Sequence, residues 1–271
     1  MKIFIYQIYY SNETKNGISP LFLGLDNLSN ERTDWFEFYP ILKFLQNNEL
    51  DNDAWYGFFS PKFQEKTGYK AEFVVDVLNK YGHTANVALF SPGWDQLSYF
   101  LNPWEQGEIW HQGITAATQK FLDDQAIGVN LNELVTDTTC STFSNYIVAK
   151  KEFWEEWKKL AEIFFIYVER ADNSLSKKTT SYGSLENQYP LKTFIQERFA
   201  SLILAKGLYK VLLPDQSLTH PIFSRLFPDD VRTRRLLITC DLLKKSYRKS
   251  FNVELLNSYW DLRKEIKFVK P

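Results

Sequence analysis

Residues 53–91, DAWYGFFSPKFQEKTGYKAEFVVDVLNKYGHTANVALFS, decide the fold class of this chain. Residues 53–59 and 86–91 are short apolar runs rich in aliphatic and aromatic side chains, as in buried strands. Between them, residues 70–81 carry apolar side chains at helical spacing, and Gly82 follows as a favoured helix end. Strands that alternate with helices predict an α/β protein with a mostly parallel sheet.

The same alternation extends in both directions from this stretch. KIFIYQIYY (residues 2–10) predicts a first buried strand, and residues 34–49 predict a helix before the second strand. Downstream we expect a strand at 141–149, a polar loop at 172–190 that could close over a substrate, and helices at 114–126, 151–170, 191–206, 229–249 and 252–267. We therefore expect a main domain at 1–215 and a helical C-terminal extension at 216–271, packed on the same domain.

Charge is unevenly distributed along the 271 residues, although the net charge is only −1. Residues 225–271 contain 12 Lys and Arg against 6 Asp and Glu, which leaves 20 basic and 27 acidic residues in 1–224. A basic segment on an acidic body indicates an anionic contact surface such as lipid headgroups. An ordinary solvated helix face is the alternative explanation.

Several function classes and locations are disfavoured by the absence of their motifs. The two cysteines suggest no disulfide framework, and no metal-binding spacing of Cys or His occurs. The sequence contains no phosphate-binding glycine loop, no Gly-x-Ser-x-Gly elbow and no nucleic-acid-binding motif. The first ten residues do not resemble a secretory signal, and no apolar run approaches the roughly 20 residues that span a bilayer. We expect a cytoplasmic protein, soluble or peripheral on the inner face of the membrane.

The stretch 86–111 combines a strand end with a dense set of polar and aromatic side chains. Its members are Asp95, Gln96, Trp104, Glu105, Gln106, Glu108, Trp110 and His111. Aromatic faces stack on sugars, and carboxylates, amides and imidazoles bind hydroxyl groups. Because ligands of open α/β sheets bind beyond strand ends, this composition favours a sugar site. The alternative is a loop whose tryptophans cover the core and whose acids are solvated.

Four segments resemble GT-A-fold bacterial glycosyltransferases of capsule, O-antigen and lipooligosaccharide (lipopolysaccharide) biosynthesis. They are KIFIYQIYY (2–10), DNDAWYGFFSPKF (51–63), SNYIVAKKEFW (144–154) and FIQERFASLIL (194–204). The resemblance implies a GT-A-like, Rossmann-like sheet flanked by helices. It also implies a hexosyltransferase that moves a sugar from a nucleotide sugar, preferably a UDP-sugar, to a growing lipid-linked polysaccharide or oligosaccharide.

The metal site of that family is incomplete in this sequence. GT-A enzymes usually hold Mn²⁺ or Mg²⁺ with an Asp-X-Asp motif at a strand end, whereas Gly93-Trp94-Asp95-Gln96 offers a single Asp. Asp51-Asn52-Asp53 has the right letters but precedes a strand. Two alternatives remain open: a metal-independent enzyme, or a site with Asp95 as the only carboxylate ligand.

Site roles follow from the chemistry of sugar transfer and from the resemblance. Glu197 is the first choice for the base that deprotonates the acceptor, as the resemblance implies, and Glu105 and Glu108 are alternatives. A structural ion pair with Arg198 is the other explanation for Glu197. The donor would be bound by Tyr9, Tyr10, Asn12, Lys62, Asp95 and Gln96, and the acceptor by Trp104, Glu105, Trp110, His111 and Asn145.

Two further function classes compete with the transferase. A non-catalytic carbohydrate-binding protein could retain a transferase-like fold, because fold does not determine function. A glycoside hydrolase would need two carboxylates across one bond, for which Glu105 or Glu108 could be paired with Asp95.

Overall fold

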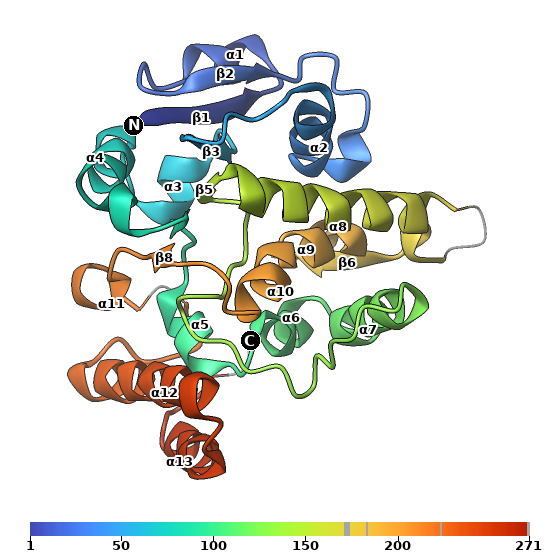
Figure 1. Cartoon of the computed structure of the whole chain (residues 1–271). Coiled ribbons are helices and arrows are strands. Elements are labelled where there is room, and N and C mark those ends of the chain that lie inside the picture. The colour runs from blue at the N-terminus through green and yellow to red at the C-terminus, as the bar shows by residue number, and fades with distance from the viewer. Residues whose placement is uncertain (171–173, 183, 223, 270–271) are drawn as a thin grey trace.

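Six strands form one mixed sheet in the order β2-β1-β3-β5-β4-β8, in a computed structural model that describes residues 1–170, 174–182, 184–222 and 224–269 (Figure 1). Their bounds are β1 Lys2–Tyr9, β2 Leu23–Asp26, β3 Ala54–Phe59, β4 Val87–Leu89, β5 Ile147–Lys150 and β8 Val211–Leu212. β1 is parallel to β2 and β3, and β4 is parallel to β8. The predicted α/β class with a mostly parallel sheet is confirmed.

β5 is the exception, because it is antiparallel to both of its neighbours, β3 and β4. After β4 the chain forms α5 (Trp94–Tyr99), α6 (Pro103–Trp110) and α7 (Ile114–Asp124) before it enters the sheet again. β5 therefore starts at the edge where β3 and β4 end, which reverses its direction. The sequence predicted this strand at 141–149, but residues 141–146 form the irregular segment that leads into it.

Helices cover both faces of the sheet. One face packs against α2 (Phe38–Asn47), α8 (Lys151–Glu169), α9 (Leu191–Gln196) and α10 (Phe199–Ala205), and the other against α3 (Phe63–Thr67) and α4 (Ala71–Tyr81). Side chains of β3 alternate between the two layers: Tyr56 and Phe58 join the first, Trp55 and Phe59 the second. This burial on both sides explains why the strand reads as a continuous apolar run.

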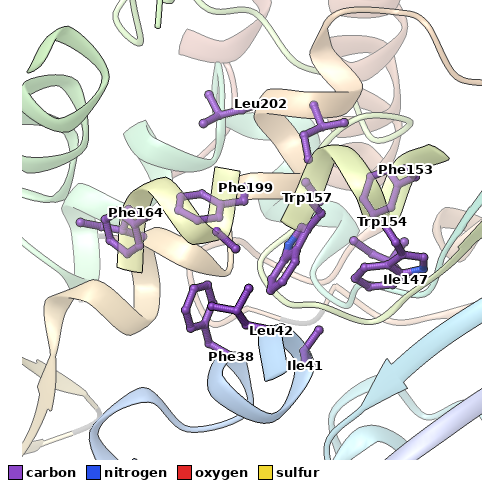
Figure 2. Close-up of a cluster of buried hydrophobic side chains, with 14 of the residues drawn as sticks. Phe38, Ile41, Leu42, Ile147, Phe153, Trp154, Trp157, Phe164, Phe199 and Leu202 are labelled. Atoms are coloured by element: carbon purple, nitrogen blue, oxygen red, sulfur yellow. The ribbon is translucent and has the colours of Figure 1, made fainter. Parts of the chain in front are cut away.

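Aromatic side chains dominate the first layer. Figure 2 shows Trp154 and Trp157 of α8 in the cluster that also holds Phe38 of α2 and Phe199 of α10, with Trp154 on the side of Ile147. The indole N–H of Trp154 donates to the carbonyl of Tyr56 at 2.9 Å, so a polar atom in this layer is satisfied by the sheet itself. Most of the high aromatic content of the sequence is therefore core.

The helices expected at 70–81, 114–126, 151–170, 229–249 and 252–267 are confirmed within a few residues, the last two as α12 (Val231–Ser250) and α13 (Val253–Lys264). The predicted helix at 34–49 is shorter, because a 3₁₀ turn at Thr33–Trp35 precedes α2. Elements without a sequence prediction are β2, β8, α1 (Asn12–Asn16), α3, α5, α6, α11 (Gln216–Thr219) and 3₁₀ turns at Gly82–Thr84 and Ser174–Lys177.

Two sequence predictions in the second half of the chain were wrong. Residues 172–190 were expected to be a loop; 171–173 and 183 lie outside the described residues, and most of the rest is a hairpin of β6 (Thr179–Tyr182) and β7 (Ser184–Pro190). The single helix expected at 191–206 is two helices, α9 and α10, separated by Glu197 and Arg198.

The C-terminal hairpin α12–α13 lies at the opposite end of Figure 1 from β1 and β2 and packs on α5. Leu237, Cys240 and Tyr259 are fully buried against Tyr99 and Phe100 in a third apolar cluster. Across the described ranges, we find no helix with the length and apolar character needed to cross a membrane.

Candidate functional site

The edge at which β1, β3 and β4 end gathers the polar segments that follow them. Gln7 Nε2 donates to the carbonyls of Ser60 and Pro61, both at 3.5 Å, and Ser60 Oγ lies 2.7 Å from the hydroxyl of Tyr146. The amide N–H of Phe143 donates to Ser91 Oγ at 3.1 Å. The segments after β1, β3 and β4 and before β5 are thus held together, at the edge where open α/β sheets bind ligands.

Glu197 reaches this edge because the helix breaks there. Asn145 Nδ2 donates to Gln196 Oε1 at 2.9 Å, and the amide N–H of Thr142 donates to Ser201 Oγ at 2.9 Å. These bonds attach the end of α9 and the start of α10 to the segment before β5. Between them, the side chain of Glu197 remains partly exposed. Among the described residues, no hydrogen bond or ion pair engages its carboxylate.

The surroundings of Glu197 favour its neutral form. Burial, with a smaller contribution from Glu37, raises the pKa of its carboxyl to about 7 against the opposing positive charges of Lys66 and Arg198. Burial, with smaller contributions from Glu37 and Glu197, likewise raises the pKa of the Tyr146 hydroxyl to about 12. Lys66 and the hydrogen bond with Ser60 oppose this rise. A carboxyl that titrates near neutral pH can both accept and release a proton there.

Glu37 is brought to this site by an unusual backbone. It precedes the first residue of α2, directly after Phe36, whose φ of 47° and ψ of −133° are strained for a residue with a side chain. Trp35 is buried in the core, and its indole N–H donates to Glu169 at 3.1 Å. Strain of this kind costs of the order of 1–3 kcal/mol and persists where packing fixes it.

Arg198 forms hydrogen bonds with backbone carbonyls and Gln106 instead of an ion pair with Glu197. Its guanidinium donates to the carbonyls of Pro103 and Phe194 at 2.9 and 2.6 Å and to Gln106 Oε1 at 2.9 Å. Gln106 in turn donates to Gln96 at 2.8 Å. These buried hydrogen bonds connect α6 and α5 to the junction between α9 and α10. In the described part of the chain Arg198 forms no ion pair with Glu197, so the ion-pair explanation of Glu197 was wrong.

Asn145, a predicted acceptor residue, does lie at this edge. Its Oδ1 is buried and accepts no hydrogen bond from any described residue, although its Nδ2 is engaged by Gln196. A buried acceptor without a donor costs about 1–3 kcal/mol unless a ligand or water supplies one. This oxygen therefore has an unused capacity to accept a hydrogen bond, which a ligand hydroxyl reaches only if the neighbouring side chains move.

The predicted donor residues divide into two groups. Tyr9 ends β1, Tyr10 follows it and Asn12 begins α1; Tyr10 is 44% exposed, whereas Tyr9 is buried and its hydrogen bond to Asp26 raises its pKa. Lys62 is exposed at the start of α3. Lys66, which the sequence analysis missed, is one helical turn further along the same short helix, a spacing of four that could have indicated it.

Asp95 and Gln96 are less accessible than the sequence suggested. Asp95 is fully buried, and its Oδ2 accepts from the amide N–H of Ser224 at 2.9 Å and from the Ser224 hydroxyl. Burial raises the pKa of Asp95. A hard cation binds charged, accessible carboxylates, so this residue does not fit a metal ligand in this conformation. Within the described residues, no group of three or more His, Cys, Asp or Glu could hold a metal ion, and Asp51 pairs with Lys2 at the start of β1.

Most of the predicted acceptor residues on α6 have structural contacts. Trp104 is fully buried in the core and presents no face to a sugar. Glu105 pairs with Arg263 at 2.8 Å, and Glu108 accepts from the amides of Gly113 and Thr115 at the start of α7. These contacts also occupy the carboxylates proposed for a hydrolase or an alternative base.

His111 and Trp110 end the same helix. The His111 ring stacks on Phe194 with centroids 3.5 Å apart, and burial, helped by Arg198, lowers its pKa to about 3. It is therefore neutral at pH 7 and a weak base. Trp110 is 38% exposed and keeps a ring surface open to solvent.

A cavity of about 880 Å³ lies on the side of α6 that faces α7 and α13. Its wall includes Glu105, Glu108 and Gln119, whose side-chain oxygens accept hydrogen bonds from the protein backbone. The cavity is thus lined by groups that stabilise α6, α7 and the loop after α7.

No protein-family model matches the chain, and neither a curated protein nor a solved structure shows significant similarity to it. The site must therefore be interpreted from its own geometry.

Proposed function

We propose that this chain is a glycosyltransferase of the GT-A type that transfers a hexose from a nucleotide sugar to a surface polysaccharide or oligosaccharide acceptor. The observation that carries the proposal is Glu197: a half-buried residue whose carboxyl has its pKa raised by burial to about 7, at the edge of the sheet where β1, β3 and β4 end and near the positive charge of Lys66. The resemblance of residues 194–204 to such enzymes, noted from the sequence, agrees with this assignment.

The chemistry of the proposed reaction assigns a role to each group. The Glu197 carboxylate takes the proton from an acceptor hydroxyl as the oxygen bonds to the anomeric carbon of the donor. The bond from that carbon to the diphosphate breaks, and the electron pair leaves with the phosphate oxygen. Positive charge near that oxygen stabilises the transition state, and Lys62 and Lys66 on α3 supply it.

Asn145 and the end of β1 would orient the two substrates. The unpartnered Oδ1 of Asn145 accepts a hydrogen bond from the acceptor hydroxyl, next to Glu197. Tyr9, Tyr10 and Asn12 contact the nucleoside part of a donor, with a UDP-sugar as the first choice. No step requires Asp95 or a bound Mn²⁺ or Mg²⁺, since the buried Asp95 does not fit a metal ligand.

The first experiment is a thermal-shift screen of the full chain against UDP, GDP, CMP and dTDP and their sugars, each with and without Mn²⁺. A ligand that binds only the folded state raises the apparent stability, by about 2.7 kcal/mol at 100 times its Kd. We expect one nucleotide class to raise the melting temperature, and a metal-dependent shift would contradict the metal-free step. No shift with any nucleotide would overturn the transferase.

The second experiment separates catalysis from binding. Glu197→Gln keeps the size and the neutral form of the side chain, so we expect unchanged donor binding and a loss of about 10²–10⁴ in transfer or donor hydrolysis. Glu108→Gln, which changes a carboxylate that caps α7, serves as the control with little loss. Sugar binding without any turnover, equal in wild type and Glu197→Gln, would instead identify a non-catalytic carbohydrate-binding protein.

A further inference from the structure

The outward side of α12 carries three apolar and three basic side chains, and one of the apolar ones, Ile238, is half-buried against the third apolar cluster. Residues spaced by four and three positions form one stripe: Val231, Arg235, Ile238, Leu242, Lys245 and Lys249. Val231 is 66% exposed and Leu242 is 55% exposed. No acidic residue interrupts the stripe, although Asp and Glu are common elsewhere in the chain.

The stripe lies directly opposite the side of α12 that packs on the protein. Thr233, Leu237, Cys240 and Lys244 are the buried residues of this helix, about half a helical turn away. Lys244 Nζ donates to the carbonyls of Leu97 and Phe100, both at 2.6 Å, so the inner face is fixed to α5. The outer face is consequently presented away from the core.

The basic residues of the C-terminal segment differ in what they contact. Arg234, Lys244, Arg248 and Arg263 bind internal carbonyls or carboxylates. Arg235, Lys245 and Lys249 form no ion pair with any described residue. The stripe therefore carries three basic groups without an ion pair, and Arg225 and Lys267, which are exposed and likewise form no ion pair with a described residue, lie outside it.

The tip of the hairpin adds large apolar side chains. Phe251 ends α12 with a φ of 55° and is 76% exposed, and Val253, the first residue of α13, is 58% exposed. The Tyr247 ring lies beside the Phe251 ring, at a centroid distance of 6.3 Å. An exposed Phe and Val beside a basic helix face is a combination typical of interfacial helices.

We propose that the outer face of α12 and the Phe251–Val253 tip dock on an anionic lipid bilayer, with the helix lying in the plane of the interface. The basic groups bind headgroup phosphates, and Leu242, Phe251 and Val253 enter the boundary of the hydrocarbon. A nucleic acid would satisfy the charges but would leave these apolar side chains in water, so a membrane is the better fit. The inference does not depend on the activity of the Glu197 site.

The test is flotation of the full chain with vesicles of phosphatidylcholine alone or with phosphatidylglycerol added. We expect binding only to the anionic vesicles, with an affinity that falls as salt rises. Each basic residue near such a surface is worth about 1 kcal/mol. The triple variant Arg235→Glu, Lys245→Glu and Lys249→Glu is therefore expected to lower the partition coefficient by about 100-fold or more.

A matched control applies the same change of charge elsewhere. Lys70→Glu, Lys80→Glu and Lys159→Glu alter exposed lysines of α4, its preceding residue and α8, and we expect no more than a small loss. Equal losses in the two triple variants, or no binding of wild type to anionic vesicles, would overturn the proposal.

The apolar contribution is tested separately. Phe251→Ser with Val253→Ser is expected to reduce anionic-vesicle binding about ten-fold, whereas Ile166→Ser, at a residue that is 57% exposed on α8, leaves it unchanged. If instead the tip variant binds vesicles like wild type while single-stranded DNA competes with them for the stripe, the stripe is a nucleic-acid site and the proposal fails. Melting curves of all variants confirm that these surface changes leave the fold intact.

Discussion

Glu197 stabilises the folded chain in its protonated form, which opposes its proposed role as a base. Its pKa is about 7 in the folded protein against an ordinary value of 4.5, so between these values the folded state holds more protons than the unfolded state. The contribution of Glu197 to the free energy of unfolding is therefore greatest below pH 4.5 and falls as pH rises to 7. Glu197→Gln is expected to be more stable than wild type at pH 8, by about 1–3 kcal/mol, and nearly equal at pH 4.5. Urea unfolding at the two pH values measures this.

Glu169 provides the control of opposite sign. Burial opposes its ionisation, but hydrogen bonds from Arg32 and Trp35 outweigh burial and lower its pKa, so its stabilising effect is present above the ordinary pKa and is lost as pH falls. Glu169→Gln is expected to destabilise the protein at pH 8. Destabilisation by Glu197→Gln at pH 8 would show that its charged form is the favoured one, and would remove the basis of the catalytic assignment.

His111 contributes a pH dependence of stability that is opposite in sign to that of Glu197 and the same in sign as that of Glu169. Its pKa of about 3 lies below the ordinary 6.5, so the unfolded state takes up a proton first as pH falls. The stability that neutral His111 supplies is complete above pH 6.5 and decreases below it, by about 2 kcal/mol at pH 5. His111→Gln is expected to flatten this part of the pH–stability curve. An unchanged slope between pH 6.5 and 5 would contradict it.

Sequence reasoning identified Glu197 and Asn145 at the site but missed Lys66 and Glu37. Glu197 was found through a resemblance, whereas nothing near Glu37 in the sequence indicates a site, because its position depends on the unusual backbone of Phe36. The residues of 86–111 illustrate the opposite error. Trp104 and Asp95 have the composition of a sugar site, yet both are buried, since residue types alone do not show which way a helix faces.

At the scale of elements, the contact between β3 and β5 leaves no room for a side chain at Gly57. A Cβ added at Gly57 would lie 2.9 Å from Val148 Cγ2 and 3.2 Å from the carbonyl oxygen of Ile147. Because backbone and a β-branched side chain cannot both give way, Gly57→Ala is expected to destabilise the protein by about 1–3 kcal/mol. Thermal or urea unfolding measures the loss.

Gly128→Ala is the matched control, because no atom lies within 4 Å of its added Cβ. We expect a change near zero or a small gain in stability from the reduced freedom of the unfolded chain. Equal effects of the two substitutions would mean that β5 can move away from β3, and that the sheet is less tightly packed at this point than the structure has it.

The elements themselves were largely predictable where one periodicity persists. α4, α8 and α12 are long and amphipathic, so side-chain spacing was enough. The break between α9 and α10 was not, because both helices are buried on all sides and the break depends on bonds to residues 142 and 145. The β6–β7 hairpin was missed because polar strands lack an apolar alternation.

At the scale of the whole molecule, the C-terminal hairpin completes a core that α5 begins. Removal of residues 225–271 would expose Tyr99 and Phe100 and delete the Lys244 and Tyr259 bonds to the end of α5. We expect the shortened chain to aggregate or to melt well below wild type, measured by soluble yield and thermal unfolding. A shortened chain that is folded, monomeric and equally stable would show that the hairpin is a separate unit.

A single substitution tests the same contact between the C-terminal hairpin and α5 without deleting the hairpin. Lys244→Met keeps the apolar packing but removes two hydrogen bonds to Leu97 and Phe100, so we expect a loss of about 1–3 kcal/mol. The sequence indicated that the extension packs on the main domain. It could not indicate that α5 is the contact, because pairing between distant helices leaves no local pattern.

The antiparallel strand β5 also has a consequence for how the protein is made. β3 and β4 face each other across β5, and residues 90–146 must be synthesised before it begins. At a synthesis rate of about 5–20 residues per second, the edges of β3 and β4 that later pair with β5 remain unpaired for roughly 3–11 s. Unpaired edges of fully buried strands are templates for aggregation, so the nascent chain is expected to be a client of chaperones until β5 joins β3 and β4.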